Sequence, residues 1–413
     1  MKPIAKILSA AFALSLVVSC SGVKTPETSS LFEPFTDPES GVVSYRLNYG
    51  APDDNRQSLY FVTKSMTEDG RFLVFMYTEG NETKGDTGPR HNMVVDFKKD
   101  EVFDLGLAKM TPFIDVKNDY MVYGDPVEGF FRRDFANPEE EVKLCDIPEA
   151  LSSLGEVRRL ATHLTLTMDR SRAFLDTEIR TPEGKTRYIQ GMLDLTTGEW
   201  DEWGETEWCC NHGQLNPIND DLAMCAWESA WEGMGKAYQD STGLYPRMWL
   251  VEKGKKTLIP AEARNFASHE IWDDDGKGIS WCGHGSVKEE DEDYVYHLDL
   301  ASGKQEAWAN VPGARHNSCS PDNKYVVTDQ APEVWWRGCK WRVAFYNRES
   351  GKYVWLYSTR DALRPQDAQS RLHPDPHPHF VMNGKYVICT ANNADGHMDL
   401  FVTPVAQLIE MTK

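Results

Sequence analysis

The chain has 413 residues, with 64 acidic against 44 basic side chains and a formal net charge of −20 at pH 7. This balance, with no basic cluster, argues against nucleic-acid binding and against general capture of polyanions, so an anionic ligand would need locally placed cations. The length exceeds the usual size of one compact core, yet no Pro-, Gly- or Ser-rich linker divides the chain, which favours a repeat architecture.

The N-terminus has the pattern of an export signal. Lys2 and Lys6 precede an apolar stretch that runs over residues 7–18, and Ser19-Cys20 follows it. This stretch is too short to span a membrane, so we predict a lipoprotein signal peptide over residues 1–19, cleaved before Cys20, whose thiol is then lipidated. The expected location is the periplasm or the outer membrane, with the lipid as the only membrane attachment.

The segment after Cys20 is rich in Ser, Thr and Pro. We predict a lipid-anchored flexible tether over residues 20–40 and a folded domain over residues 41–413. Of the nine cysteines, only Cys209 and Cys210 lie close together, and no CxxC or zinc-ribbon spacing occurs. No disulfide pairing is therefore predicted. Nothing in the chain requires more than a monomer.

A unit of apolar or aromatic strands separated by turns of Asp, Asn or Gly recurs along the domain. The turn positions come at intervals of roughly fifty residues, which is typical of β-propeller blades. Seven such units fit the chain, with these turn positions: Gly70, Asp119, Arg170, Asp221, Gly276, Asn323 and Gly384.

Units of this length cannot bury both faces alone and stack radially, so the expected fold is all-β, a seven-bladed β-propeller. A strand near Val42–Leu47 is expected to complete the last blade and close the ring. Much of the high aromatic content is expected to pack between blades. Amphipathic helical stretches are nearly absent outside Pro148–Leu154, which disfavours a parallel βαβ fold.

Histidines recur at corresponding points of the later repeats, which suggests a shared axial site. His269 and His316 each lie at the start of a repeat, and the last repeat begins with the segment Arg371–Phe380, which contains three histidines and Asp375. Neutral imidazole with carboxylate suits Mn²⁺, Zn²⁺, Fe²⁺ or Ni²⁺. The prolines of the segment hold it extended, so it is expected to be a rigid loop.

These motifs resemble those of the oligogalacturonate lyases. The resemblance covers residues from about 55 to 405 and is more specific from His212 onward. It rests on four motifs: Arg247-Met-Trp-Leu, Ser268-His-Glu-Ile-Trp, Arg315-His-Asn-Ser and His373–Phe380. The resemblance implies a seven-bladed propeller with a divalent metal, usually manganese, in the central cavity. It also implies cleavage of short uronate-containing oligosaccharides by β-elimination to 4,5-unsaturated products, as in pectin degradation.

The resemblance assigns His269 as the catalytic base and Arg247 as the residue that clamps the substrate carboxylate or stabilises developing negative charge. This fits the chemistry, because imidazole has a pKa suited to base catalysis near neutrality. A metal ion acting as a Lewis acid would neutralise the uronate carboxylate.

The expected metal ligands are His316, His373, Asp375 and His377. The family pattern Arg-Gln-x-x-His-Pro-His-Pro-x-Phe is not fully kept, since Leu372 stands at its glutamine and Asp375 at its first histidine. His373 would fill the gap from an adjacent position. In a shifted alternative, His377 pairs with His379.

The expected substrate contacts are His212, Gln214 and Glu228. For Gln214, an amide whose hydrogen bonds are satisfied within a loop is an equally favoured interpretation. Beside Glu228, Trp227 stands where the family has a histidine, which suggests altered substrate recognition. Arg90, with its neighbour His91, is interpreted as a solvated strand entry in preference to a residue facing an open end of the propeller.

Two further hypotheses stay open beside the lyase. One is a glycoside hydrolase on the same scaffold, which would need a pair of facing carboxylates. The other is a non-catalytic, glycan-binding propeller lipoprotein, which predicts loss of the base or the metal ligands. The lyase hypothesis requires Arg247, His269, His316 and His377 to converge on one cavity.

Overall fold

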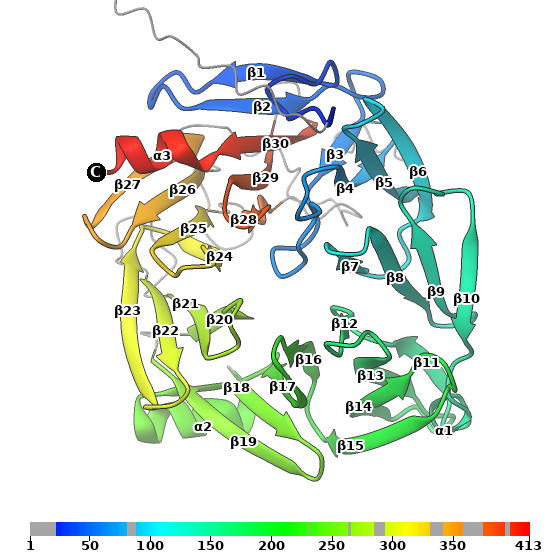
Figure 1. Ribbon diagram of the computed structural model, residues 1–413. Coiled ribbons are helices and arrows are strands. Elements are labelled where there is room, and N and C mark those ends of the chain that lie inside the picture. The colour runs from blue at the N-terminus through cyan, green and yellow to red at the C-terminus, as the bar shows by residue number, and fades with distance from the viewer. Residues whose placement is uncertain are drawn as a thin grey trace, which may run out of the picture.

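The computed structural model describes residues 22–80, 88–230, 232–262, 266–284, 294–330, 342–357, 375–392 and 397–413. The expected signal peptide, Cys20 and His373 lie outside these residues. The described strands form seven antiparallel sheets arranged in a ring around a central axis, as Figure 1 shows. The predicted seven-bladed β-propeller is therefore confirmed.

Each blade begins with its innermost strand and proceeds outward, except where noted for blade 3. Blade 1 contains β3 (Asn55–Gln57), β4 (Phe72–Thr78), β5 (Arg90–Asp96) and β6 (Glu101–Leu107). Blade 2 contains β7 (Phe113–Asp115), β8 (Tyr120–Asp125), β9 (Gly129–Asp134) and β10 (Glu141–Cys145). Blade 3 contains β11 (Glu156–Arg159), β12 (Thr165–Leu166), β13 (Arg172–Arg180), β14 (Thr186–Asp194) and β15 (Trp200–Thr206), with β11 and the short inner strand β12 both pairing with β13.

Blades 4 to 6 repeat the four-stranded pattern. Blade 4 contains β16 (Cys210–Asn216), β17 (Asn219–Trp227), β18 (Tyr245–Glu252) and β19 (Lys255–Ala261). Blade 5 contains β20 (Phe266–Trp272), β21 (Gly278–His284), β22 (Tyr294–Asp299) and β23 (Lys304–Asn310). Blade 6 contains β24 (Ala314–Cys319), β25 (Tyr325–Gln330), β26 (Arg342–Asn347) and β27 (Lys352–Tyr357).

Blade 7 closes the ring with strands from both ends of the chain. Its inner strands are β28 (His379–Val381), β29 (Tyr386–Asn392) and β30 (Met398–Pro404). The outer strands are β2 (Val43–Leu47), which pairs with β30, and β1 (Phe32–Thr36), which pairs with β2. The expected ring closure by the strand near Val42–Leu47 is thus confirmed.

The expected tether over residues 20–40 is wrong from Phe32 onward, because β1 forms a regular strand pair there. Before β1, Asp100 accepts hydrogen bonds from the side chains of Lys24, Ser29 and Ser30. Ser, Thr and Pro content indicated a flexible segment, but the free edge of β2 and the Asp100 carboxylate hold this segment on the propeller. The folded domain therefore begins before residue 41.

The recurring turn residues have a conformational reason. Asp119, Arg170 and Asn323 have φ values of 60°, 67° and 57°, and Gly70, Gly276 and Gly384 are also left-handed. Glycine adopts this region at little cost and Asn and Asp tolerate it better than most residues. The same turn geometry in six of the blades produces the repeat that is visible in the sequence. The expected turn position Asp221 is wrong, because this residue lies within β17.

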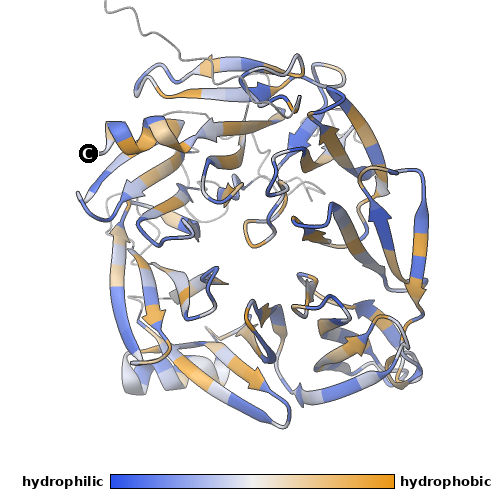
Figure 2. Ribbon diagram, viewed as in Figure 1, coloured by the Kyte–Doolittle hydropathy of each residue, from blue (hydrophilic) through white to orange (hydrophobic). Residues whose placement is uncertain are grey.

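The core consists of seven hydrophobic clusters, and each lies where two neighbouring blades meet. Trp281 and Tyr245 share the cluster between blades 4 and 5, and each is at most 1% exposed. Figure 2 shows hydrophilic and hydrophobic residues mixed along the outer strands. Burying a large apolar side chain contributes about 1.5–3 kcal/mol, so the expected role of aromatic residues in packing between blades fits.

Helices are short and peripheral. α1 (Glu149–Ser152) falls within the predicted helical stretch, while α2 (Gly233–Thr242) and α3 (Val405–Met411) were not expected. None of the helices in the described part of the chain has the length and apolar character needed to cross a membrane. The seven cysteines within the described residues form no disulfide bond with one another.

Candidate metal and catalytic site

The inner strands of several blades are irregular at the point where each carries a histidine. In β16, β20 and β24 the pairing register shifts around His212, His269 and His316. His212 and His269 have φ values of 52° and 56°, and His377, just before β28, has a φ of 46°. A left-handed residue other than Gly costs about 1–3 kcal/mol, and such strain is concentrated at functional sites.

Three of the expected metal ligands meet at one point. Donor atoms of His316, Asp375 and His377 all lie within 4.8 Å of one another. The rings of His316 and His377 have centroids 4.5 Å apart, and Asp375 Oδ2 lies 4.0 Å from His316 Nε2. His316 Nε2 is buried with no hydrogen-bond partner among the described residues. Two imidazoles and a carboxylate in this arrangement fit a divalent transition metal.

Asp329, in β25, organises two of these ligands. Its carboxylate lies 2.9 Å from His316 Nδ1 and accepts the backbone N–H groups of His316 and His377 at 2.9 and 3.1 Å. Asp329 is 1% exposed, so solvent does not compete for these bonds. Because His316 Nδ1 donates to the carboxylate, the lone pair of Nε2 is directed to the side where Asp375 lies.

His269 lies against the metal cluster but is not one of its donors. Its ring centroid is 3.9 Å from that of His316. Its Nδ1 lies 2.6 Å from the carbonyl oxygen of Arg315, and a carbonyl only accepts, so Nδ1 carries the proton and Nε2 the lone pair. Burial, together with the positive charge of Arg315 and Arg247, lowers the pKa of His269 well below its ordinary value. His269 is therefore a neutral imidazole at pH 7, with Nε2 as the basic atom.

Arg247 is buried between two carboxylates. Its Nε donates to Glu270 Oε2 at 2.9 Å and its Nη1 to Glu228 Oε2 at 3.2 Å. Burial alone would lower the pKa of Arg247, but Glu270 and Glu228 outweigh it and raise the pKa. Glu270 is 1% exposed, whereas the Glu228 side chain is 38% exposed, so a ligand can reach Glu228 but not Glu270.

His212 links the Arg247–Glu228 ion pair to the histidines around the propeller axis. Its Nε2 lies 3.6 Å from Glu228 Oε2, and its Nδ1 lies 3.2 Å from His163 Nε2. Burial and the nearby Arg247 lower the pKa of His212 to about 3, so it is neutral at pH 7. His163 is therefore in contact with a predicted substrate-binding residue.

Tyr60, in the connection between β3 and β4, lies at the centre of the histidines. Its ring is stacked on His163 at 4.5 Å and lies 4.6 Å from His377 and 5.9 Å from His316, measured between centroids. Burial and the nearby Glu270 raise its pKa well above the ordinary value, so the phenol is neutral. The first blade thus contributes the aromatic ring of Tyr60 to a site whose other residues come from blades 3 to 7.

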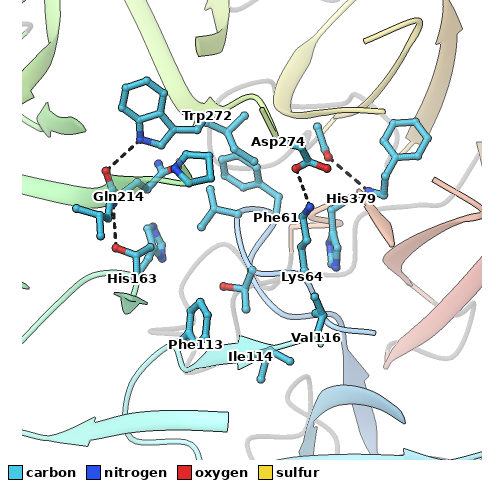
Figure 3. Close-up of a pocket in the computed structure, with 18 of the residues that line it drawn as sticks. Phe61, Lys64, Phe113, Ile114, Val116, His163, Gln214, Trp272, Asp274 and His379 are labelled. Carbon is cyan, nitrogen blue, oxygen red and sulfur yellow. Dashed lines mark hydrogen bonds and ion pairs between the residues drawn. The ribbon is translucent and has the colours of Figure 1, made fainter. Parts of the chain in front are cut away.

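A further cavity of about 480 Å³ lies toward the other end of the channel, and its wall includes His163 and Phe61, which contact His212 and His316. Its wall is built from the C-terminal ends of the inner strands, while His212, His269 and His316 precede those ends. Figure 3 shows this cavity, with the ion pair between Lys64 and Asp274 at 2.7 Å. We call it the distal cavity.

Two residues considered for the site belong to the distal cavity instead. The Gln214 amide donates to the backbone oxygen of Glu270 at 2.8 Å, which matches its reading as a satisfied amide. His379 Nε2 contacts Ser65 Oγ at 2.8 Å, and burial lowers the pKa of His379 to about 4. The structure does not bring either side chain to the metal cluster, so the shifted pairing of His377 with His379 receives no support.

The structure brings together most of the predicted site residues. His316, Asp375 and His377 form the metal cluster with His269 beside it, and Arg247, Glu228 and His212 form a neighbouring polar network. Three contributing residues were missed: Asp329, Glu270 and Tyr60. A carboxylate after the apolar run Tyr325–Thr328 was a signal for Asp329, whereas no sequence signal singled out Tyr60.

Comparisons with known proteins agree on the fold. No protein-family model and no curated protein matches the chain. A solved oligogalacturonate lyase in complex with manganese has a TM-score of 0.71 at 19% identity, covering 90% of this chain and 96% of that chain. An oligogalacturonate lyase from Vibrio parahaemolyticus has a TM-score of 0.70 at 19% identity, covering 91% and 96%. A variant of puromycin hydrolase has a TM-score of 0.57 at 11% identity, covering 91% and 56%. At these identities the likeness establishes the propeller fold.

Proposed function

We propose that this protein is a metal-dependent lyase that cleaves short uronate-containing oligosaccharides by β-elimination. The observation that carries the proposal is the position of His269. Its ring lies 3.9 Å from His316, while its Nδ1 is bound to the Arg315 carbonyl, so that Nε2 is the free basic atom next to the metal cluster. The solved oligogalacturonate lyases with the same fold, one of them a manganese complex, support the reaction class.

His316, Asp375 and His377 would hold the divalent cation, for which we propose Mn²⁺, while Zn²⁺, Fe²⁺ and Ni²⁺ are also compatible with these ligands. When bound, the cation would withdraw electron density from the uronate carboxylate and make the C5 proton more acidic. Asp329 would keep His316 in the tautomer that presents Nε2.

His269 Nε2 would remove the C5 proton. The electron pair of the C5–H bond forms the C4–C5 double bond, the bond from C4 to the glycosidic oxygen breaks, and that oxygen takes up one proton. The His269 imidazolium then returns to the neutral form, so the reaction has no net proton change. The neutral imidazole of His269 at pH 7 is the form that can accept the proton.

Arg247, Glu228 and His212 would position the sugar. Glu228 is the exposed member of this network, and its carboxylate accepts a hydrogen bond from Arg247 and lies 3.6 Å from His212 Nε2. A sugar hydroxyl that binds Glu228 would therefore also meet His212. The buried Glu270 carboxylate accepts a hydrogen bond from Arg247 Nε and so holds the guanidinium group in one orientation.

The test is an ultraviolet assay for 4,5-unsaturated product on di- and trigalacturonate, with metal-stripped protein and with protein given Mn²⁺. We expect absorbance to grow only with the metal. Growth that is independent of the metal, or reducing ends released without absorbance, would reject the proposal, and the second result would indicate a hydrolase. Binding of the same sugars without turnover at any metal would indicate the glycan-binding alternative.

We also propose that the protein acts as a monomeric exported lipoprotein on oligosaccharides that other enzymes release from a polymer. Export and anchoring rest on the sequence pattern alone: Lys2 and Lys6, the apolar residues 7–18, and Cys20. Metabolic labelling with a fatty acid, compared between the natural chain and Cys20→Ser, should label only the natural chain.

A further inference from the structure

The two faces of the propeller carry different connections. Neighbouring strands of a blade run antiparallel, so the turn between its first and second strands and the turn between its third and fourth strands lie at the same face. Pro217 and Asn383, in two of these turns, line the distal cavity, and we call this face the distal face. The connection between β17 and β18 begins with Glu228 and includes α2, so it lies at the opposite face, which we call the metal-site face.

The first described residues lie against the distal face, where blades 7 and 1 are neighbours (Figure 1). The backbone N–H of Lys24 donates to the carbonyl oxygen of Phe97 at 3.0 Å, in the turn between β5 and β6. Asp100, in the same turn, pairs with the Lys24 ammonium at 2.5 Å. On the side of blade 7, the hydroxyl of Tyr386, at the start of β29, donates to the Glu27 carboxylate at 3.1 Å. Contacts to both blades therefore hold this segment on the distal face.

The position of this segment limits where a lipid on Cys20 can lie. Four residues separate Cys20 from Lys24, so their Cα atoms are at most about 14 Å apart. The seven-residue strand β5, which runs from the metal-site face to the distal face, is longer, since it rises by about 24 Å. A bilayer that holds acyl chains on the Cys20 thiol would therefore lie next to the turn between β5 and β6, and not at the metal-site face.

Exposed lysines border the place where the segment meets the distal face. Lys98 and Lys99 lie in the turn between β5 and β6, and Lys385 lies in the turn between β28 and β29. The chain as a whole has a net charge of −20, which gives no general attraction to an anionic membrane. The lipid would therefore supply most of the membrane affinity, while these lysines would favour the approach of anionic headgroups to this face.

We propose that the distal face is the surface that docks on the lipid bilayer, so that the metal-site face is directed away from the membrane. This inference rests on the proposed lipid anchor at Cys20 and is independent of the proposed reaction. The distal cavity would then face the lipid headgroups. The metal site would receive dissolved molecules from the aqueous compartment, whereas a glycan attached to the same bilayer would have to extend past the whole depth of a blade.

The experiment measures resonance energy transfer from a dye on the protein to labelled lipid. The full chain, purified with its lipid, is placed in vesicles of phosphatidylethanolamine and phosphatidylglycerol that contain a small fraction of acceptor-labelled lipid. An azide-bearing amino acid that carries the donor dye replaces either Lys117, in the turn before β8, or Val127, in the turn after β8; both side chains are exposed. The six-residue strand β8 separates these turns by about 20 Å. Transfer should be more efficient from position 117, at the distal face, than from position 127.

Two variants test whether the contacts of the N-terminal segment set this orientation. Asp100→Ala removes the contacts with Lys24 and Ser29 and should reduce the difference between the two dye positions, because the chain before β1 then becomes a longer and looser link. The matched control is Asp201→Ala, which removes an exposed carboxylate paired with Lys253 on the outer part of blade 3. It should keep the difference of the natural chain.

The outcomes separate the docking surface from the anchor. Equal transfer from the two positions, or more efficient transfer from position 127, would overturn the docking surface and leave the lipid anchor intact. Failure of the natural chain to bind vesicles, or equal binding by the Cys20→Ser protein, would overturn the lipid anchor and the docking surface together. The lyase proposal is tested separately, by the ultraviolet assay on the same protein in solution.

Discussion

The two ends of the central channel are built from the same inner strands, yet they differ in how their polar groups are satisfied. At the metal cluster, His212, His269 and His377 have left-handed backbones, and His316 Nε2 has no partner among the described residues. At the distal cavity, Lys64 pairs with Asp274 at 2.7 Å. The ion pair satisfies the charges of Lys64 and Asp274 within the distal wall, whereas His316 Nε2 at the cluster is left for a ligand.

The comparison also separates two kinds of histidine. His379 is buried and His269 is partly buried, and both have pKa values lowered by burial. The Nδ1 and Nε2 atoms of His379 are both in contact, with the His377 carbonyl and with Ser65, so neither atom is left for a ligand. Position in the repeat alone therefore does not identify the functional histidines.

The largest expected effect is on catalysis at the metal end. Replacing His269 with Ala should lower the rate of unsaturated product formation by about 10²–10⁴-fold, because the general base is removed. The distal control, Asp274→Asn, should leave the rate unchanged. A comparable loss in the control would show that the ends of the channel are not functionally distinct.

The next largest effect is on stability. Arg247→Met leaves the buried Glu270 carboxylate unpaired, so we expect the free energy of unfolding to fall by about 3–5 kcal/mol, measured by urea denaturation. Adding Glu270→Gln to that variant should recover part of the loss, since the unpaired charge is gone. No recovery in the double variant would contradict the assignment of the loss to a buried charge.

A smaller effect is expected on metal affinity. Asp329→Asn removes the charge that orients His316 without removing a ligand, and we expect Mn²⁺ to bind about 10–100-fold more weakly, measured by calorimetry. The control is Asp322→Asn, which changes a carboxylate in the turn between β24 and β25. Unchanged affinity in the Asp329→Asn protein would mean that another contact holds the His316 tautomer.

The smallest expected effect is a pH dependence of stability at the distal end. Burial would raise the pKa of Asp115, but hydrogen bonds from Asn118 and Arg170 outweigh it, so the pKa lies below its ordinary value. A lowered folded-state pKa means that this carboxylate stabilises the fold above the unfolded-state pKa, and that the contribution is lost as the pH falls through the folded-state value.

Asp115→Asn should therefore destabilise the protein by about 1–3 kcal/mol at pH 7, and the difference from the natural chain should shrink as the solution is acidified below about pH 4. Urea unfolding at a series of pH values measures this. If the difference in the free energy of unfolding stays constant on acidification, the effect comes from the shape of the Asp115 side chain and not from its charge. Product formation at pH 7 should be the same in both proteins.

The fold followed from the sequence because its determinants are local and repeated. Turn residues such as Asp119, Arg170 and Asn323 take the left-handed conformation within their own blade. The apolar and aromatic strands on either side of these turns can be recognised within each single repeat. The exception is the segment before residue 41. Composition indicated a tether there, but β1 became a strand because β2 offers it an open edge.

The sequence by itself determined which residue types reach the axis, since histidines recur at the start of successive repeats. Only the tertiary structure decided which of them meet. The grouping of His316 with Asp375 and His377, the carboxylate of Asp329 behind them and the phenol of Tyr60 from the first blade depend on closure of the ring and on irregular pairing in the inner strands. Contacts between residues so far apart in the chain leave no periodic pattern in the sequence. The sequence could therefore suggest a site, but it could not identify all of the residues that form it.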